Sequence, residues 1–344
     1  MQAVHVTRHG GPEVLELVDL PIPEPGPGEA LVRVLAVSVN HLDLWVRRGM
    51  PGFPIPFPRI PGCDGTGEIL RLGPGAGGFA TGQLVVLEPG YNEQDSPLVR
   101  SGLEHLAEDY AIRGEHGDGF DREFVACPTR YLTALPAGTD PVQAAAVPLA
   151  FLTAWTMVHL RAAVRARESV LVIGGASGVG SAAIQLCRAE GARVLATAGS
   201  AAKLALVREL GAEVAFDHHS SDWPREVRAA TDGRGVDVVI EHVGPATWTG
   251  SMKVLARNGR LVTCGGTSGA KVEIVLPHLF AKNISILGST MGPRSAFPAI
   301  FEGLARGRWR AVVDRVLPLS EVRTAHALLE QREVLGKIVL VPGH

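Results

Sequence analysis

The stretch VLVIGGASGVGSAAIQL, residues 170–186, is an apolar run that glycines interrupt before it continues with helical periodicity. Val179, Ala182, Ala183 and Leu186 fall at i, i+3, i+4 and i+7, which places them on one face of a helix. A strand, a glycine turn and the start of a helix therefore follow one another. Such a turn aims free backbone N–H groups and the positive end of the helix at one point, which suits a phosphate.

The glycine turn has the spacing of a dinucleotide-binding loop. It reads Gly175-Ala176-Ser177-Gly178-Val179-Gly180, so a serine occupies the middle position of the GxGxxG pattern. The pattern alone is weak evidence, but a strand precedes it, a helix follows it, and a second strand ends about twenty residues later. We predict that this turn binds the pyrophosphate of a dinucleotide. The alternative is a tight strand-to-helix turn without a ligand.

The end of the second strand, VLATAGSAAK at residues 194–203, bears on which dinucleotide binds. An NAD site places Asp or Glu there to hold the ribose hydroxyls. Gly199 and Ser200 stand there instead, so no acid repels a 2′-phosphate, and both Ser200 and Lys203 can donate to one. We predict NADP(H) in preference to NAD(H). The alternative for Lys203 is a solvated helix residue.

The pattern of apolar residues along the sequence changes near residue 150. Before it, alternating apolar residues and Pro/Gly turns indicate β-rich structure. After it, short apolar runs alternate with helical segments, and strands are expected at residues 170–173, 194–197, 214–216, 236–240, 261–264 and 284–287. Six strands with helical crossovers imply a mostly parallel, doubly wound sheet. The tail GKIVLVPGH is strand-like and is expected to return to the first part.

Composition excludes several classes of partner. The 344 residues suggest two domains, and 46% hydrophobic with 20% charged residues is ordinary for a folded protein. A net charge of −2 gives no general attraction to nucleic acid or to an anionic membrane. No membrane span or apolar signal segment is apparent. The cysteines are far apart and form no CxxC pair, which favours a reducing cytoplasm.

Further motifs extend the pattern along the chain: PEPGPGEALVRV, VNHLDLWVRRG, PGCDGTGEI, GPGAGGFATGQLV, VDVVIEHVG, GRLVTCGG, ILGST and GKIVL. With the glycine turn, they make the chain resemble the medium-chain dehydrogenase/reductase superfamily over almost its whole length. That superfamily includes zinc alcohol dehydrogenases and zinc-free quinone (enone) reductases. The resemblance implies an α/β protein with a GroES-like β-rich catalytic domain, residues 1–150 and 288–344, and a Rossmann NAD(P)-binding domain, residues 151–287. It also implies a homodimer or homotetramer, joined through the sheet edge near residues 284–287.

The zinc ligands of the superfamily can be compared with this chain position by position. Asn40 stands where zinc alcohol dehydrogenases carry a ligand cysteine, and GCD at residues 62–64 stands where they have Gly-His-Glu. The segment VPLAFLTAW lacks their second ligand cysteine. Cys63 and Asp64 remain as possible ligands, but a catalytic zinc needs three, and His41 as a substitute sits one position off. We predict no catalytic zinc.

The region that matches the structural zinc lobe, residues 88–119, contains no cysteine. Glu104, His105, Glu108 and Asp109 have a spacing that would suit a metal on one helix face. The simpler interpretation is a solvated helix face. We expect packing and charge pairs to hold this lobe.

Without a metal, the chemistry favours a conjugated acceptor. A plain ketone needs strong polarisation of its oxygen, which zinc supplies as a Lewis acid. In a quinone or enone, conjugation spreads the developing charge, so hydrogen-bond donors suffice. By the resemblance, Asn40 would donate to the carbonyl oxygen, and His41 would be a nearby donor or proton source. Asp43 is either catalytic or a structural residue at a helix start; Asn40 and His41 have structural alternatives too.

The resemblance also implies residues around the two ligands. Trp45, Phe53 and Cys63 would line the substrate pocket, although aromatic residues are more often core. Thr153 would contact the nicotinamide carboxamide. Loops after later strands, and one lysine near the chain end, would line the cofactor: His242, Val243, Gly265, Gly266, Thr267, Gly288, Ser289 and Lys337. The remaining histidines, including His218 and His219, are interpreted as surface residues.

Three functions therefore stay open. The first is a zinc-independent NADPH:quinone or enone oxidoreductase acting on a small-molecule carbonyl compound. The second is an alcohol dehydrogenase that retains a metal through Cys63, Asp64 and a substitute ligand. The third is an NADPH-binding sensor without turnover, since Rossmann folds also serve for binding alone.

Overall fold

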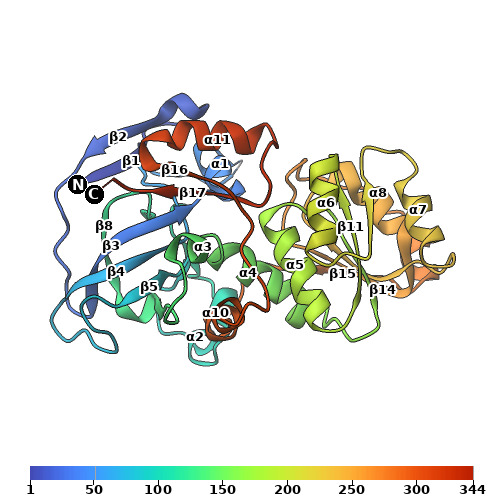
Figure 1. The fold of residues 1–344 in the computed structure, drawn as a ribbon, viewed down its shortest axis with the longest axis horizontal. Coiled ribbons are helices and arrows are strands. Elements are labelled where there is room, and N and C mark those ends of the chain that lie inside the picture. Colours follow the sequence, from blue (N-terminus) through green and yellow to red (C-terminus); the bar gives the residue numbers. More distant parts are fainter. Residues whose placement is uncertain (51, 344) are drawn as a thin grey trace. The chain divides into compact units, whose positions relative to one another are not determined.

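The computed structural model describes residues 1–50 and 52–343 and divides the chain into two compact units (Figure 1). Unit 1 comprises Met1–Leu149 and Pro293–His344, and unit 2 comprises Ala150–Gly292. The expected second boundary lay at residue 288. The chain stays with unit 2 beyond that point because Ser289 N–H donates to the carbonyl of Thr263 at 2.8 Å.

Unit 2 contains a six-stranded parallel sheet with the order β12-β11-β10-β13-β14-β15. The strands are β10 (Ser169–Val172), β11 (Arg193–Ala198), β12 (Val214–Asp217), β13 (Val236–Glu241), β14 (Leu255–Thr263) and β15 (Ser285–Gly288). The helices are α5 (Gly178–Ala189), α6 (Ala201–Glu209), α7 (Trp223–Ala229), α8 (Pro245–Val254) and α9 (Leu276–Ala281). The doubly wound sheet is thus confirmed. The strand order reverses between β10 and β13, where such sheets bind their ligands.

One element of unit 2 differs from the sequence interpretation. The fifth strand was expected to begin at residue 261, but β14 already begins at Leu255, directly after α8 ends at Val254. Leu255 pairs with Val236 on β13 and is fully buried, so side-chain burial favours the strand there. Asn258 has a φ of 61°, and the register shifts at this point before regular pairing resumes at Arg260.

Unit 1 is built on a seven-stranded sheet with the order β16-β17-β3-β4-β5-β9, in which β8 also pairs with β3. The strands are β3 (Glu29–Ser38), β4 (Gly65–Leu72), β5 (Leu84–Leu87), β8 (Phe124–Pro128), β9 (Leu132–Ala134), β16 (Val313–Pro318) and β17 (Lys337–Val341). Two small sheets pair β1 (Gln2–Val6) with β2 (Leu15–Asp19) and β6 (Gly90–Tyr91) with β7 (Ala111–Ile112). The C-terminal strand β17 runs antiparallel to β3, so the tail returns to the first part as expected.

The helices of unit 1 are α1 (His41–Arg48), α2 (Pro97–Arg100), α3 (Pro141–Ala145), α10 (Phe297–Ala305) and α11 (Val322–Glu330). Helix α4 (Pro148–Trp155) crosses the boundary between the units and continues as a π-helical turn, Thr156–Arg161. Short 3₁₀ turns occupy Pro12–Val14, Glu104–Leu106, Thr129–Tyr131, Arg294–Ala296 and Leu319–Glu321. No helix in the part of the chain that the structure describes is long and apolar enough to cross a membrane.

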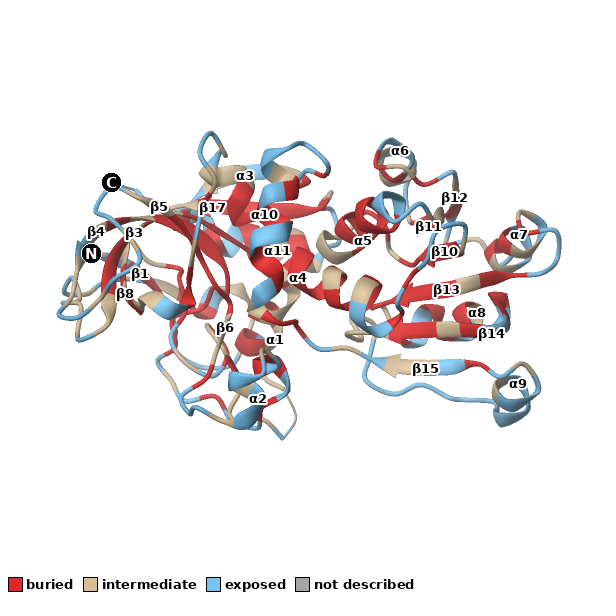
Figure 2. Cartoon of the chain, turned by 90° about the horizontal axis from the view of Figure 1, so that it is seen from below, coloured by how far each residue is buried: buried red, intermediate tan, exposed pale blue. Residues whose placement is uncertain are grey.

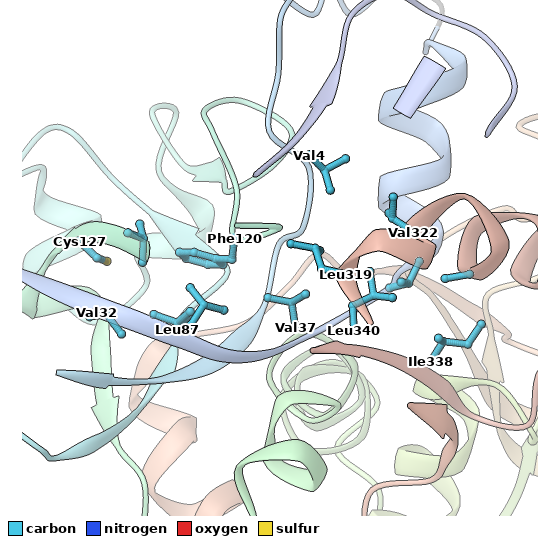
Figure 3. Packing of buried hydrophobic residues seen from close by; sticks show 14 of the residues in the cluster. Val4, Val32, Val37, Leu87, Phe120, Cys127, Leu319, Val322, Ile338 and Leu340 are labelled. Atoms are coloured by element: carbon cyan, nitrogen blue, oxygen red, sulfur yellow. The ribbon is translucent and has the colours of Figure 1, made fainter. Parts of the chain in front are cut away.

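The core of unit 1 joins both ends of the chain. Val37 from β3 and Leu340 from β17 lie close together, and Leu319 and Val322 from the C-terminal segment pack above them (Figure 3). All four side chains are buried. The sheet of unit 1 is therefore closed by β17, which also carries Lys337.

The lobe at residues 88–119 is held by an ion pair and by hydrogen bonds to the backbone, but not through a helix face. Glu104 and His105 are buried on a 3₁₀ turn, so the expected solvated helix face is wrong. Glu88 accepts two hydrogen bonds at 3.0 Å from the Arg294 guanidinium. Asp109 accepts the N–H groups of residues 93 and 94 at 2.9 and 2.8 Å. These bonds close the lobe because each one ties separate loops together.

Candidate active site

The glycine turn of unit 2 is fixed to the neighbouring strand. Gly175 N–H donates to the carbonyl of Thr197 at 2.8 Å, and Gly174 N–H donates to Thr197 Oγ1 at 3.1 Å. Ser177 is the N-cap of α5, and its Oγ accepts the N–H of Gly180 at 3.0 Å. The turn therefore presents one defined backbone conformation at the end of β10.

Three backbone N–H groups of this turn are available to an anion. Within residues 1–50 and 52–343, the N–H groups of Ala176, Gly178 and Val179 have no acceptor. They are the donors that the first turn of a helix leaves without an internal partner. Together with the positive end of α5, they fit a pyrophosphate.

Packing requires glycine at two positions of the turn. A Cβ on Gly180 would lie 2.4 Å from the carbonyl oxygen of Gly174. A Cβ on Gly175 would lie 2.9 Å from both Ile184 Cδ1 and Val207 Cγ1. The helix thus approaches the strand more closely than any side chain permits.

The predicted ribose end lies where β11 meets α6. Ser200 is the N-cap of α6, and its Oγ accepts the N–H of Lys203 at 3.3 Å. His218 and His219, interpreted from the sequence as surface residues, belong to this end of the sheet as well. A Cβ on Gly199 would lie 2.7 Å from Nε2 of each ring, so both histidines pack over this glycine. Their position directly after β12 was the available signal, because parallel strands end at the same edge of a sheet.

The loop after β13 is shaped by a buried carboxylate that the sequence analysis missed. Glu241 is fully buried and accepts the N–H groups of Val243 and Gly244 at 2.7 and 3.1 Å. His242 Nε2 lies 3.3 Å from Ser177 Oγ, and burial lowers the pKa of this histidine. The signal was the acid Glu241 at the end of the largely apolar run VDVVIE.

The remaining predicted cofactor residues of unit 2 follow β14 and β15, except for one on α4. Thr267 N–H donates to the carbonyl of His242 at 3.3 Å, which joins the loop containing Gly265 and Gly266 to the β13 loop. Ser289, next to Gly288, has a buried hydroxyl without a partner in the described chain. Thr153 is buried on α4. The unsatisfied hydroxyl and the open N–H groups both fit a bound dinucleotide.

In unit 1, six residues form what we name the polar cluster: Ser38, Asn40, Asp43, Cys63, Asp64 and Lys337. All six are buried. Asn40 Nδ2 lies 3.0 Å from the carbonyl of Ser38 and 3.0 Å from Asp64 Oδ1, and it lies 3.2 Å from Cys63 Sγ. Lys337 Nζ donates to Asn40 Oδ1. The amide of Asn40 is therefore engaged within the cluster, which does not favour the expected donation to a substrate.

Asp43 has the structural role that the sequence analysis left open. Its Oδ2 accepts the N–H of Asn40 at 2.7 Å, and its Oδ1 accepts the N–H of Gly62 at 3.3 Å. Burial raises the pKa of Asp43 to about 7, and the nearby Asp64 carboxylate acts in the same direction, whereas Lys337 opposes it. The bonds fix the start of α1 against the loop that carries Cys63.

The polar cluster does not fit a catalytic zinc. Asp64 already accepts hydrogen bonds from Ser38 Oγ at 2.7 Å and from Leu149 N–H at 2.8 Å, besides the one from Asn40. Across residues 1–50 and 52–343, no three His, Cys, Asp or Glu side chains are grouped to hold a metal ion. A zinc site requires at least three such ligands, and here an ammonium group stands beside the two candidates.

Of the residues expected around the substrate, Cys63 is fully buried in the polar cluster, whereas three others are less deeply buried. His41 is the first residue of α1 and is half-buried, as is Trp45 one turn later. Phe53 is half-buried as well and packs edge-on against His116, with ring centroids 5.0 Å apart. Partial exposure leaves these side chains accessible to a small molecule.

Comparison with known proteins shows to which family the chain belongs. The family models "Alcohol dehydrogenase GroES-like domain" and "Zinc-binding dehydrogenase" match residues 26–137 and 178–306. Quinone oxidoreductase from Homo sapiens is 30% identical over 349 residues, which cover 99% of this chain and 98% of that protein. The chain belongs to the medium-chain dehydrogenase/reductase superfamily. As a member of this superfamily, it is an NAD(P)-dependent oxidoreductase with a GroES-like unit and a Rossmann unit.

Other members of the superfamily show the range of the resemblance. An NAD-dependent alcohol dehydrogenase of known crystal structure shares 43% sequence identity with this chain, with a TM-score of 0.96 and full coverage of both chains. Phthioceranic/hydroxyphthioceranic acid synthase from Mycobacterium tuberculosis is 32% identical over 98% of this chain. The chain spans only 15% of the length of that synthase.

Proposed function

We propose that the chain reduces a quinone or enone with NADPH and without zinc. The observation that carries this proposal is the bonding of the polar cluster. Cys63 and Asp64 lack a third ligand among the described residues, and Lys337 brings a positive charge to the same cluster. A conjugated acceptor suits such a site because it needs less polarisation than a plain ketone.

In this proposal, residues of unit 2 bind the cofactor and residues of unit 1 bind and protonate the acceptor. In unit 2, the glycine turn binds the pyrophosphate through its open N–H groups, and the loops after β13 and β14 line the nicotinamide half. The nicotinamide supplies the hydride. In unit 1, His41 donates a hydrogen bond to the acceptor oxygen and then a proton, so that hydride and proton together complete the reduction. Asn40 and Asp43 are positioning residues that hold the start of α1.

Two assays at the near-ultraviolet absorbance of NADPH test this function: oxidation of NADPH with a panel of quinones, enones and aldehydes, and reduction of NADP⁺ with a panel of alcohols. Zinc content is measured on the same sample, and the assay is repeated with a chelator. We expect turnover with quinones or enones, no stoichiometric zinc and no effect of the chelator. Stoichiometric zinc with chelator-sensitive alcohol oxidation would instead support the alcohol dehydrogenase, which the 43% identity to an NAD-dependent alcohol dehydrogenase favours. Cofactor binding without turnover of any acceptor would support a sensor.

The preference for NADP(H) is part of the proposal. Ser200, Lys203 and the two histidines over Gly199 are neutral or basic, and none of them repels a 2′-phosphate. The replacement Ser200→Asp is expected to reduce the ratio of NADPH to NADH affinity about a hundredfold, since a carboxylate repels the phosphate and binds the ribose hydroxyls. Titration of both cofactors measures this ratio.

The control for this replacement is Ser200→Asn. Asparagine and aspartate both cap a helix, so α6 keeps its start in either variant and only the charge differs. An equal change of the ratio in both variants would show that the charge at Ser200 does not select the cofactor.

We also propose that two copies of the chain associate through the free edge of the unit 2 sheet. We further propose that the protein resides in a reducing cytoplasm. Figure 2 shows β15 and α9 more exposed than β13 and β14. Leu276 and Phe280 on α9 are 62% and 69% exposed. Such apolar residues beside an unpaired edge strand are typical of an association site. The four cysteines are free, which agrees with a reducing compartment.

The replacement Phe280→Glu is expected to shift the chain towards monomer, because it would bury a charge in the interface. Light scattering coupled to gel filtration, over a range of concentrations, measures the mass. Leu106→Glu is the matched control. Leu106 is 54% exposed and belongs to unit 1, whereas the proposed association edge belongs to unit 2. A wild-type monomer at all concentrations would reject the proposed association through this edge.

A further inference from the structure

A cavity of about 370 Å³ lies in unit 2, at the end of the sheet where the central strands begin. It is lined by Arg228, Arg234, Leu255, Ala256, Arg257 and Lys282. Arg234 stands just before β13, Leu255 opens β14, and Lys282 stands just before β15. The glycine turn follows the last residue of β10. Because the strands are parallel, this cavity and the glycine turn lie at opposite ends of the sheet.

Three of the four cations are fixed by backbone carbonyls. Arg257 Nη1 donates to the carbonyl of Ala281 at 2.7 Å, and Lys282 Nζ donates to the carbonyl of Leu255 at 2.9 Å. Arg228 Nη2 donates to the carbonyl of Gly233. These neutral partners hold the side chains in place without cancelling their charge.

Only one cation has an acidic partner. Arg234 makes two hydrogen bonds of 2.7 Å to the Asp237 carboxylate. Within the described chain, Arg228, Arg257 and Lys282 form no ion pair with a carboxylate. Burial lowers the pKa of Lys282, and the charges of Arg228 and Arg257 lower it further. The cavity thus gathers positive charge that the protein itself leaves uncompensated.

A purely structural explanation covers each bond but not their convergence. Arg228 and Lys282 lie at the C-terminal ends of α7 and α9, where basic side chains often bind the last carbonyls. Arg228 and Lys282 could bind the last carbonyls of their helices equally well if their side chains pointed away from each other. Bringing three unpaired cations to one cavity costs electrostatic energy, which a bound anion would recover.

We propose that this cavity binds a small anion that carries a phosphate or pyrophosphate group, at a site separate from that of the dinucleotide. Guanidinium groups match phosphate oxygens in pairs, which favours phosphate over a monovalent anion. The volume is that of a small-ligand pocket, and Leu255 and Ala256 provide an apolar wall for an organic part. The inference does not depend on which carbonyl compound the enzyme reduces.

Inorganic pyrophosphate is the probe, and the protein is first saturated with NADPH so that the glycine turn is occupied. Isothermal titration calorimetry is expected to show one saturable site in the wild type. Replacement of Arg257 and Lys282 together by Gln is expected to weaken binding at least about tenfold, since two charge-assisted bonds are lost. Potassium chloride at equal ionic strength should give no saturable signal.

The matched control is Arg225→Gln, because Arg225 also lies on α7 but its side chain is 88% exposed and does not line the cavity. Arg257→Lys keeps the charge without the planar guanidinium, and its smaller loss would separate recognition from misfolding. The proposal is overturned if the NADPH-saturated wild type shows no saturable pyrophosphate binding. It is equally overturned if the double variant binds like Arg225→Gln.

Discussion

Replacement of Gly180 by alanine is expected to reduce the affinity for NADPH about a hundredfold, which corresponds to ~2.7 kcal/mol. A Cβ at this position would lie 2.4 Å from the carbonyl oxygen of Gly174 and 2.8 Å from Gly175 Cα. Both are backbone atoms, so the contact is relieved only by moving α5 away from β10. The open N–H groups would then no longer converge on one phosphate position. Fluorescence titration of NADPH measures the effect.

The control is Gly77→Ala. A Cβ on Gly77 would meet nothing within 4 Å, and this residue lies in an exposed turn of unit 1. Circular dichroism and thermal melting of both variants show whether unit 2 still folds. A folded Gly180→Ala protein with wild-type affinity would contradict the assignment of this turn to the pyrophosphate.

Replacement of Lys337 by methionine is expected to lower kcat about a hundredfold and to change how stability depends on pH. Lys337 is buried and bonds Asn40, and its charge opposes the rise in the pKa of Asp43. Without Lys337, Asn40 loses a bond that fixes the start of α1, where His41 lies, and a hundredfold fall in kcat corresponds to ~2.7 kcal/mol. Steady-state kinetics measures kcat, and melting between about pH 5 and 9 measures stability.

The sign of the pH effect follows from the raised pKa of Asp43. In the folded chain this pKa is about 7, above its ordinary value, so the folded state binds the proton more tightly than the unfolded state. The stability that Asp43 contributes is therefore present at acid pH and is lost as the pH rises towards about 7. Without Lys337 the pKa rises further, so the variant should lose more stability relative to the wild type at pH 8 than at pH 5.

Two controls accompany this variant. Lys337→Arg keeps the charge and should retain the wild-type pH profile. Lys253→Met removes an exposed lysine of α8 in unit 2 and should change neither the profile nor kcat. Parallel melting profiles for the wild type and Lys337→Met would show that Lys337 does not balance the buried carboxylates.

Local patterns in the sequence were enough to predict most strands of the Rossmann unit. Short apolar runs, glycine spacing and i, i+3, i+4 periodicity predict strands β10 to β13 and the helix that begins at Gly178. These signals depend only on residues that are close together in the sequence. The start of β14 was missed because Leu255 is drawn into the sheet by burial against β13, a contact that local propensity does not report. His218 was missed because the residues that it contacts, Thr197 and Gly199, belong to the end of another strand. Glu241 bonds to residues close in sequence, and what local pattern did not report is its complete burial at the end of β13.

What the sequence by itself determined is the kind of protein: a dinucleotide-binding sheet, a β-rich partner unit and the loss of the zinc ligand pattern, all of which depend on residue type and spacing. Only the tertiary structure decided the roles within the polar cluster. Asn40 and Lys337 are 297 residues apart, and their bond exists because β17 closes the unit 1 sheet beside β3. A donor bonds to an acceptor that lies near it in the folded chain. Tertiary packing therefore decided which hydrogen bonds Asn40, Asp43 and Asp64 form.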